Sequence, residues 1–445
     1  MAVPGRAWAV TAAGTAVNLC LGILYGWSVW KAALVPKDPA LYGQPMHGVN
    51  EGWTYLDNVG GTVAYSVCGI TFALFMIPGG RLQDRYGAKI GATLGGLFLA
   101  VGCIVAGLMK SYEGLIIGFG LLGGIGMGLG YAAATPAAVK WFHSSRRGLI
   151  VGLVVAGYGA AAVYISPLAD YLISHYGLTG SFVGLGILFA VVVVIAGQLL
   201  TPPPAGYVAP APDSGRAGDR RRSQGEPAGG SPSQAESPLL AQPSASPSND
   251  FTAKQMLRTW QFYALVFLFI GSAQSGLIVI ANAKPFLTDA AGKTGFFAEY
   301  AWILVTFIGV VNATGRVGTG RYSDRIGRLN AYALNGLVST MCLLAAPWVI
   351  EEKNVLLLFT IIGVMAWQYG GTLAVMPAIT ADYYGPKNLG LNYGLVFIGW
   401  GAAFLIPLAA SAIQKATGRW DGAFYLSAGL LLAAVLVSRV MRKPG

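Results

Sequence analysis

The chain alternates between long runs of apolar residues and short polar stretches. Twelve runs each approach or exceed the roughly 20 residues that a helix needs to cross the hydrocarbon core of a bilayer. They cover approximately residues 7–30, 55–78, 88–109, 113–138, 148–173, 181–200, 261–287, 298–319, 329–350, 354–378, 388–414 and 422–440. One soluble core cannot bury so many segments, so the pattern predicts an all-α polytopic membrane protein with twelve transmembrane helices.

Composition and charge support a membrane protein and predict its orientation. Hydrophobic residues make up 55% of the chain and charged residues only 11%. When successive loops are assigned to alternate sides, most of the 29 Lys and Arg residues fall on the side of the N-terminus. This bias predicts a multi-pass protein of the cell inner membrane with both termini in the cytoplasm. The net charge of +11 is then a topology signal, and nucleic acid is not an expected partner.

Two related motifs show that the chain repeats itself. Gly80-Arg-Leu-Gln-Asp-Arg-Tyr-Gly87 and Gly320-Arg-Tyr-Ser-Asp-Arg-Ile-Gly327 agree at five of eight positions, 240 residues apart. The pairs Pro136 with Pro377 and Pro167 with Pro407 recur at nearly the same offset. A constant period predicts two parallel six-helix halves. We expect them to cover residues 1–200 and 259–445, joined by a disordered cytoplasmic linker over 201–258 that is rich in Pro, Ser and Gly.

These features together resemble the major facilitator superfamily. Twelve helices in two halves, with a Gly-x-x-x-Asp-Arg-x-Gly motif after the second and eighth helices, are typical of that superfamily. Further segments resemble the oxalate:formate antiporter family, which includes bacterial lactate transporters and is related to animal monocarboxylate transporters. These segments are residues 18–30, 140–142, 376–385 and 392–394.

Arg316 is the ionisable residue that stands out within the predicted spans. If the helix ends in a loop at Asp324 or already at Gly320, Arg316 lies about 6 to 12 Å inside the membrane. A cation there usually faces a polar pathway and has a partner. Asp170 and Lys284 fall near span ends and Asp382 lies beyond one, and no acid in the chain is an obvious partner. A guanidinium binds a carboxylate through two parallel hydrogen bonds, so an anionic substrate is the natural ligand.

Asn312 lies one turn before Arg316 on the same helix face and is expected to orient it. The related helix of animal monocarboxylate transporters has an aspartate at this place, and an amide does not take up a proton at neutral pH. The resemblance also implies a second intramembrane cation in oxalate carriers, a lysine in helix eleven. Here the segment contains Trp400 and no lysine, which favours a monocarboxylate over a dianion.

The remaining candidate residues line the predicted cavity or control access to it. We expect an apolar pocket with a few hydroxyl groups, formed by aromatic and aliphatic side chains on helices one, four, five, ten and eleven. The candidates are Leu24, Tyr131, Tyr158, Trp367, Tyr369 and Trp400. The resemblance implies that the two repeated motifs act as gates, through Asp84, Arg85, Asp324 and Arg325.

The sequence therefore predicts a secondary active transporter of small monocarboxylates, such as lactate, pyruvate or formate. Its partners would be an organic carboxylate anion, the lipid bilayer, and either protons or a counter-anion. Two alternatives are an exchanger of oxalate or another dicarboxylate, and a non-transporting sensor on the same fold. No catalytic constellation, metal site or cofactor motif is apparent, so an enzyme is not expected.

Overall fold

The structure is a computed structural model that describes residues 4–143, 147–204, 207, 209, 250–292, 295–385 and 388–444. Eleven helical segments of the described chain are long and apolar enough to cross a membrane. One of them, α7 (Arg147–Leu199), leaves helical geometry at Gly177 and supplies two spans, which gives twelve. The predicted fold class, an all-α polytopic membrane protein, is confirmed.

The helices fall into two groups along the chain. The first group is α1 (Gly5–Leu21), η1 (Gly22–Gly26), α2 (Trp27–Leu34), η2 (Pro39–Leu41), η3 (Gly48–Asn50), α3 (Gly60–Tyr86), α4 (Ala88–Met109), α5 (Tyr112–Gly114), η4 (Leu115–Gly123), α6 (Gly124–Val139) and α7. The second group is α8 (Ala253–Met256), α9 (Trp260–Ala291), α10 (Phe296–Glu299), α11 (Trp302–Ile326), α12 (Arg328–Glu351), α13 (Val355–Tyr384), α14 (Leu389–Val396), α15 (Ile398–Ala402), α16 (Leu405–Thr417) and α17 (Asp421–Val440).

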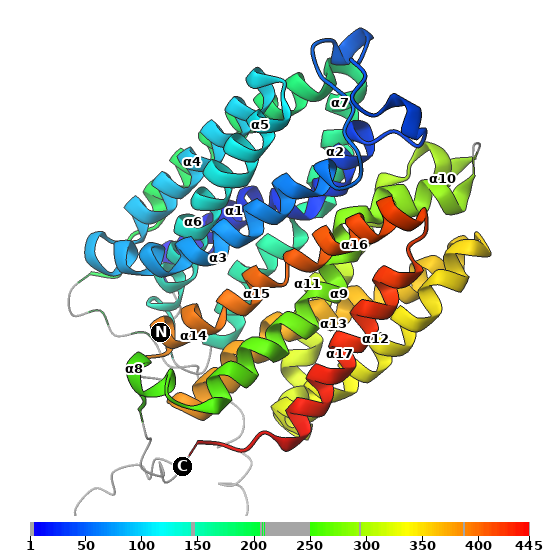
Figure 1. Cartoon of the computed structure of the whole chain (residues 1–445). Helices are drawn as coiled ribbons and strands as arrows, with labels where there is room; N and C mark the ends of the chain where they lie inside the picture. The colour runs from blue at the N-terminus through cyan, green and yellow to red at the C-terminus, as the bar shows by residue number, and fades with distance from the viewer. Residues whose placement is uncertain are drawn as a thin grey trace, which may run out of the picture.

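The two groups form two bundles that lie side by side (Figure 1). They meet where α7 packs against α11, α2 against α9, and α3 against α15. Both chain ends lie at the same end of the bundle, which we call the terminal end (Figure 1). The opposite end, where α2, α10 and α16 finish, is called the far end.

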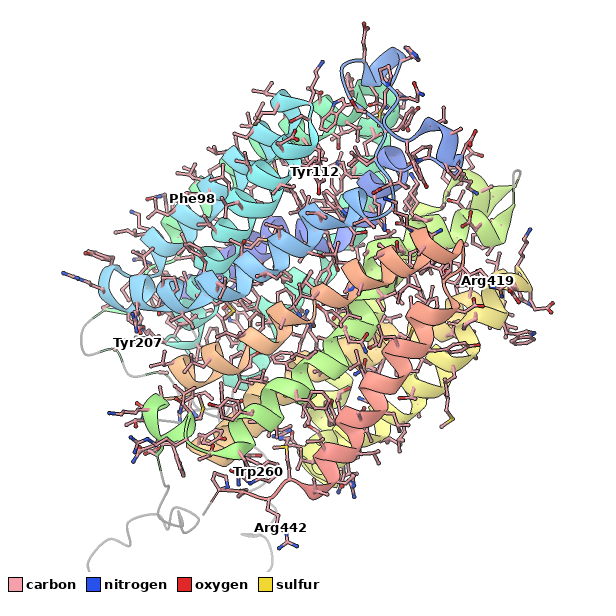
Figure 2. The ribbon with its side chains drawn as sticks, viewed as in Figure 1. Phe98, Tyr112, Tyr207, Trp260, Arg419 and Arg442 are labelled. Carbon is pink, nitrogen blue, oxygen red and sulfur yellow. The ribbon has the colours of Figure 1, made fainter. Side chains whose placement is uncertain are left out.

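Apolar side chains cover the outside of the bundle as well as its core. Phe98 on α4 points outward and is 37% exposed, and Trp260 lies at the terminal end at the start of α9 (Figure 2). Large exposed hydrophobic residues are expected where lipid rather than water surrounds a helix, and Trp is enriched at the membrane interface. The surface thus agrees with a multi-pass membrane protein.

The two repeated motifs are more helical than predicted. Asp84 and Arg85 lie in the last turn of α3, and Asp324 and Arg325 in the last turn of α11. Each helix ends at the final glycine of its motif, Gly87 with φ 87° and Gly327 with φ 92°. A positive φ favours glycine, so the glycine and not the charged residues ends the helix. Arg316 is therefore ten residues from the end of α11 at Ile326, about 15 Å, and lies deeper than expected.

The first span also extends further than predicted. Its helix runs on through α2 to Leu34, so Lys31, which the predicted boundary placed outside the membrane span, lies within it. Lys31 is 1% exposed. The expectation that Arg316 stands out as the ionisable residue within the spans was therefore wrong, because Lys31 is buried within a span as well. The error arose because the apolar sequence continues through Ala32, Ala33 and Leu34, beyond a single charged residue.

Most of the predicted linker lies outside the described residues, so its disorder stays a prediction. Its two ends are described. The Tyr207 ring contacts the Trp141 ring at a tilt of 58°, and its hydroxyl donates a hydrogen bond to the Trp141 carbonyl oxygen at 3.1 Å. At the other end, Thr252 and Gln255 form a capping box at the start of the short helix α8.

Candidate functional site

Arg316 lies in the interior of the bundle, on the face of α11 that meets the first half. Its side chain is buried, and its three described hydrogen bonds go to neutral oxygens. Nε donates to Asn312 Oδ1 at 3.1 Å, Nη1 to the Val155 carbonyl oxygen at 3.4 Å, and Nη2 to the Tyr25 hydroxyl at 3.2 Å. No described ion pair involves Arg316. A buried cation held only by dipoles remains able to bind an anion.

Asn312 supports this arginine in the way that the helical spacing predicted. It is 1% exposed, and its side-chain oxygen accepts the Arg316 bond. Its Nδ2 is buried and has no hydrogen-bond partner within the described part of the chain. This donor is therefore free to bond an oxygen atom placed next to it.

Two tyrosine hydroxyls and an indole extend the polar site across the two halves. The hydroxyl of Tyr25 lies 3.0 Å from that of Tyr369, and Trp400 Nε1 donates to Tyr369 at 2.9 Å. Each hydroxyl oxygen thus accepts one bond, from Arg316 or from Trp400. Between the two tyrosines only one O–H can donate, so the other O–H proton is not used in this chain of bonds. That hydroxyl can donate to a carboxylate oxygen.

Aromatic rings form the apolar wall beside these groups. Tyr158 makes edge-to-face contacts with Tyr25 at 5.2 Å and with Tyr131 at 5.3 Å between ring centroids. Phe72 on α3 contacts Tyr131 at 5.5 Å and Trp400 at 5.0 Å. The wall is built from both halves. Its aromatic character suits the apolar part of a small organic acid.

The structure brings most of the predicted pocket residues together. Tyr131, Tyr158, Tyr369 and Trp400 lie within this aromatic cluster. Leu24 is fully buried in η1, next to Tyr25. Trp367 differs from the others because it is only half-buried. Its indole packs against Gly318 of α11, where an added Cβ would lie 2.5 Å from the ring.

The predicted gate residues are exposed at the terminal end. Asp324 forms an ion pair with Arg328 of its own half, and the Arg85 guanidinium lies over the Tyr86 ring at 5.2 Å. None of the described ion pairs joins the two halves at this end.

At the far end, by contrast, three described ion pairs join the halves. Lys37 pairs with Asp289 at 2.7 Å and Lys415 with Asp57 at 2.6 Å. Lys284 pairs with Asp170, two residues that the sequence placed near span ends without indicating that they meet. These three ion pairs therefore hold the two halves together at the far end.

Phe72 was not predicted as a member of the site, and the contact that Tyr25 makes with Arg316 was not predicted. Phe72 lies in an apolar run in which nothing distinguishes it from neighbouring residues. Tyr25 is a polar aromatic residue directly after Leu24 and was expected to line the cavity, but its bond to Arg316 joins positions 291 residues apart. Lys31, which lies outside this cluster, was missed because the end of its helix was placed at residue 30, four residues before Leu34.

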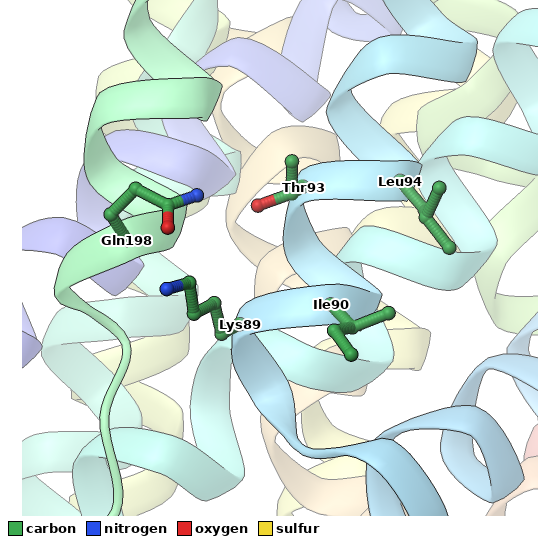
Figure 3. Close-up of a pocket in the computed structure, with 5 residues that line it drawn as sticks. All are labelled: Lys89, Ile90, Thr93, Leu94 and Gln198. Atoms are coloured by element: carbon green, nitrogen blue, oxygen red, sulfur yellow. The ribbon is translucent and has the colours of Figure 1, made fainter.

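A separate pocket of about 230 Å³ lies on the outside of the first half (Figure 3). Lys89, Ile90, Thr93 and Leu94 of α4 line it together with Gln198 of α7 (Figure 3). Ile90 and Leu94 are exposed residues on the outer surface. The pocket shares no residue with the Arg316 cluster.

Comparison with known proteins identifies the family. The sequence model of the Major Facilitator Superfamily matches residues 52–351 and 283–445. This chain belongs to the major facilitator superfamily. It is thus a membrane transporter protein by family, as the repeated motifs predicted, and not a member of an enzyme family.

Several relatives cover most of the chain. An uncharacterised major facilitator transporter, YhjX of Escherichia coli K12, is 26% identical over 88% of this chain and 84% of its own length. The oxalate:formate antiporter of Oxalobacter formigenes is 23% identical over 89% of both chains. Monocarboxylate transporter 12 of Xenopus laevis is 24% identical over 82% of this chain and 78% of its own.

A solved structure supports the fold. The xylose transporter XylE from E. coli, in a partially occluded inward-open conformation, superimposes with a TM-score of 0.65 over 97% of both chains at 13% sequence identity. This similarity concerns the fold alone.

Proposed function

We propose that this major facilitator protein is a secondary active transporter of small monocarboxylates of the lactate, pyruvate or formate type, coupled to protons and working by alternating access. The observation that supports it most is Arg316, a buried guanidinium whose described partners are all neutral. A carboxylate would supply the missing negative charge and fit the planar guanidinium. The two relatives named for carboxylates are consistent with this substrate class.

In this proposal the surrounding side chains have separate roles. Arg316 binds the carboxylate, Asn312 positions Arg316 and donates through Nδ2, and a tyrosine hydroxyl of the Tyr25 and Tyr369 pair donates a further bond. The remaining pocket residues shape the apolar wall and limit the size of the substrate. They are Leu24, Tyr131, Tyr158, Trp367 and Trp400.

We assign the terminal end to the cytoplasm of a cell whose inner membrane holds the protein, because of the excess of Lys and Arg in the loops on that side. The far end then faces outward and is closed here by ion pairs. Asp84, Arg85, Asp324 and Arg325 are proposed to latch the cytoplasmic end when the far end opens. Residues 1–200 and 259–445 would be the two rocking halves, joined by the 201–258 linker.

Proton coupling in this proposal does not use the side chain of residue 312. Asn312 occupies the place of the aspartate expected by resemblance to animal monocarboxylate transporters, and an amide is not protonated at neutral pH. In this proposal the substrate binds Arg316 as an anion and then takes up the proton on its own carboxylate. Exchange against another anion is the alternative mode of coupling.

Uptake of labelled L-lactate into vesicles containing the purified protein tests the proposal. Wild type and Arg316→Lys are compared with and without an inward proton gradient. We expect gradient-stimulated uptake by wild type and its loss in Arg316→Lys, since an ammonium cannot reproduce the planar fork of a guanidinium. Wild-type protein that ignored lactate but exchanged oxalate for formate would refute the monocarboxylate assignment.

Oxalate:formate exchange is the second candidate because Lys31 is a second buried cation. Lys31 follows Tyr25 by six residues, about 9 Å along the helix, so one small dianion would not bridge it and Arg316. This separation is why we favour a monocarboxylate.

A further inference from the structure

The pocket that α4 and the end of α7 form on the outside of the first half lies close to the terminal end, and we call it the outer pocket. Lys89 is the second residue of α4, and Gln198 is the last residue but one of α7. From there α4 runs into the bilayer, with Ile90 and Leu94 exposed on its outer side. The outer pocket therefore lies where lipid headgroups meet the hydrocarbon core.

Three polar side chains lie together in the outer pocket. Figure 3 shows Lys89 and Thr93, one turn apart on α4, extending toward Gln198 of α7. Thr93 Oγ1 is buried and has no hydrogen-bond partner among the residues that the structure describes. It lies against Gly197, where any side chain would clash with it, so α7 approaches α4 closely at the base of the pocket. An ammonium, a hydroxyl and an amide N–H thus offer donors within one small space.

The Lys89 ammonium has no anionic partner in the described part of the chain. None of the described ion pairs involves Lys89, and none joins it to Asp84, which precedes it by five residues. In addition, α4 begins without a capping side chain and without an acidic residue in its first turn. The positive end of the helix dipole and the charge of Lys89 therefore act at the same place, where they attract an anion.

The surface that continues from the outer pocket into the bilayer is apolar. Its exposed residues include Leu97, Phe98 and Val101 of α4 and Val191, Val194 and Ile195 of α7. From Ile90 to Val101 the helix rises about 16 Å, which is roughly the depth of one leaflet of the hydrocarbon core. A ligand with a negatively charged head and a long apolar tail would match both parts of this surface.

We propose that the outer pocket binds a phospholipid with an anionic headgroup. The headgroup accepts hydrogen bonds from Lys89 and Gln198, and an acyl chain lies along Ile90 and Leu94. Basic pockets between transmembrane helices at the cytoplasmic face favour such lipids, and the terminal end is the end assigned to the cytoplasm. The bound lipid bridges α4 and α7 and so stabilises the packing of the first half. This binding does not depend on which substrate the protein carries.

Lipid binding to the purified full-length protein in detergent tests the proposal. Native mass spectrometry counts the lipids retained after addition of phosphatidylglycerol or phosphatidylcholine with the same acyl chains, so the two lipids differ only in their headgroups. The variants are Lys89→Met, which removes the charge, Lys89→Arg, which keeps it, and Ile90→Trp, which fills the apolar part of the pocket. Lys254→Met is the matched control, because Lys254 of α8 is also exposed at the terminal end and forms no described ion pair.

We expect the wild type to retain phosphatidylglycerol about five-fold more than phosphatidylcholine, since one lysine near anionic lipid contributes about that factor. Lys89→Met should retain the two lipids equally, whereas Lys89→Arg and Lys254→Met should keep the wild-type preference. Ile90→Trp should retain about one phosphatidylglycerol molecule fewer per protein. If Lys89→Met is not monodisperse in size-exclusion chromatography, Lys89→Gln takes its place.

A wild type without this preference, or a Lys89→Met protein that keeps it, would overturn the proposal. Equal losses of phosphatidylglycerol in Lys89→Met and Lys254→Met would do the same, because the lipid would then respond to total charge and not to the outer pocket. Displacement of phosphatidylglycerol by an equal concentration of glycerol 3-phosphate would assign the pocket to a soluble anion instead. None of these results would alter the proposed transport function.

Discussion

Arg316 and Asn312 are joined by a hydrogen bond of 3.1 Å from Nε to Oδ1, one helical turn apart on α11. Both side chains are buried, so the amide orients the guanidinium without neutralising it. This pairing leaves the charge of Arg316 available to a substrate. A carboxylate at position 312 would instead compete for it.

The substitution Asn312→Asp tests that relationship. The new carboxylate should form an internal ion pair with Arg316 and raise the apparent KM for lactate about 10- to 100-fold at pH 7, since a hydrogen bond to a charged group contributes about 1.5–3 kcal/mol. Asn312→Ser shortens the side chain and adds no charge, so we expect a smaller rise. Concentration-dependent uptake measures both. An Asn312→Asp protein with wild-type KM would show that Arg316 does not bind the carboxylate.

Substitution of Tyr25 or Tyr369 by Phe should distinguish an effect on substrate binding from an effect on protein stability. Tyr25→Phe removes the Arg316 partner and should raise KM about three- to tenfold, as for loss of one hydrogen bond of about 1 kcal/mol. Tyr369→Phe also leaves Trp400 Nε1 without its acceptor, so it should in addition lower the thermal stability. The control is Tyr164→Phe, whose hydroxyl bonds the Leu19 carbonyl oxygen at 3.0 Å within the first half. Similar KM changes in all three variants would argue against a specific role for the pair.

The ion pair between Asp57 and Lys415 joins the two halves at the far end and favours its closed arrangement. Burial raises the pKa of Asp57, but the bonds from the Gly60 amide and Lys415 lower it more, so the pKa lies below its usual range. The ionised Asp57 therefore stabilises the closed far end at any pH above the ordinary aspartate pKa of about 4. This stabilisation is lost only as the pH falls through the lowered pKa of Asp57. Between pH 5 and 8 we expect this pair to contribute no pH dependence to closure.

Asp57→Asn keeps an oxygen to accept the Gly60 bond but removes the charge. Asp57→Asn should increase the fraction of molecules with an open far end only about two- to five-fold, because exposed ion pairs are weak. The measurement is labelling of Leu34→Cys by an impermeant thiol reagent, in a background without the four native cysteines. Asp421→Asn is the control, since its Arg419 pair at 2.7 Å lies within the second half. Equal labelling in the two variants would contradict a latch between the halves.

Gly95 on α4 tests the close packing of helices within the first half. A Cβ at this position would lie 2.4 Å from the Gly130 nitrogen and 2.7 Å from the Gly126 oxygen of α6. Gly95→Val must push the two helices apart, which typically costs 1–3 kcal/mol or more. We expect a clear loss of monodisperse protein in size-exclusion chromatography. Gly429→Val in α17 should be tolerated, because a Cβ there meets nothing within 4 Å.

Much of the architecture could be predicted because it depends on local composition. Apolar runs long enough to span a bilayer, the repeated motif and the positions of Pro136 and Pro377 led to twelve helices in two halves. Arg316 and Asn312 were also predictable, because a helix places residues four apart on one face. The helix ends were less certain, since charged residues at a membrane interface continue a helix until a glycine such as Gly327 ends it.

The sequence by itself determined that this protein crosses the membrane many times and holds an arginine within one span. Only the tertiary structure decided what surrounds the buried charges. Lys31 meets Asn282 and Ser411 across 251 and 380 residues, and Arg316 meets Tyr25 across 291. Such contacts arise because one half packs against the other. The periodicity of a single helix does not predict them. For that reason the site of Arg316 could be located in the sequence, while the cluster around Lys31 appeared only in the fold.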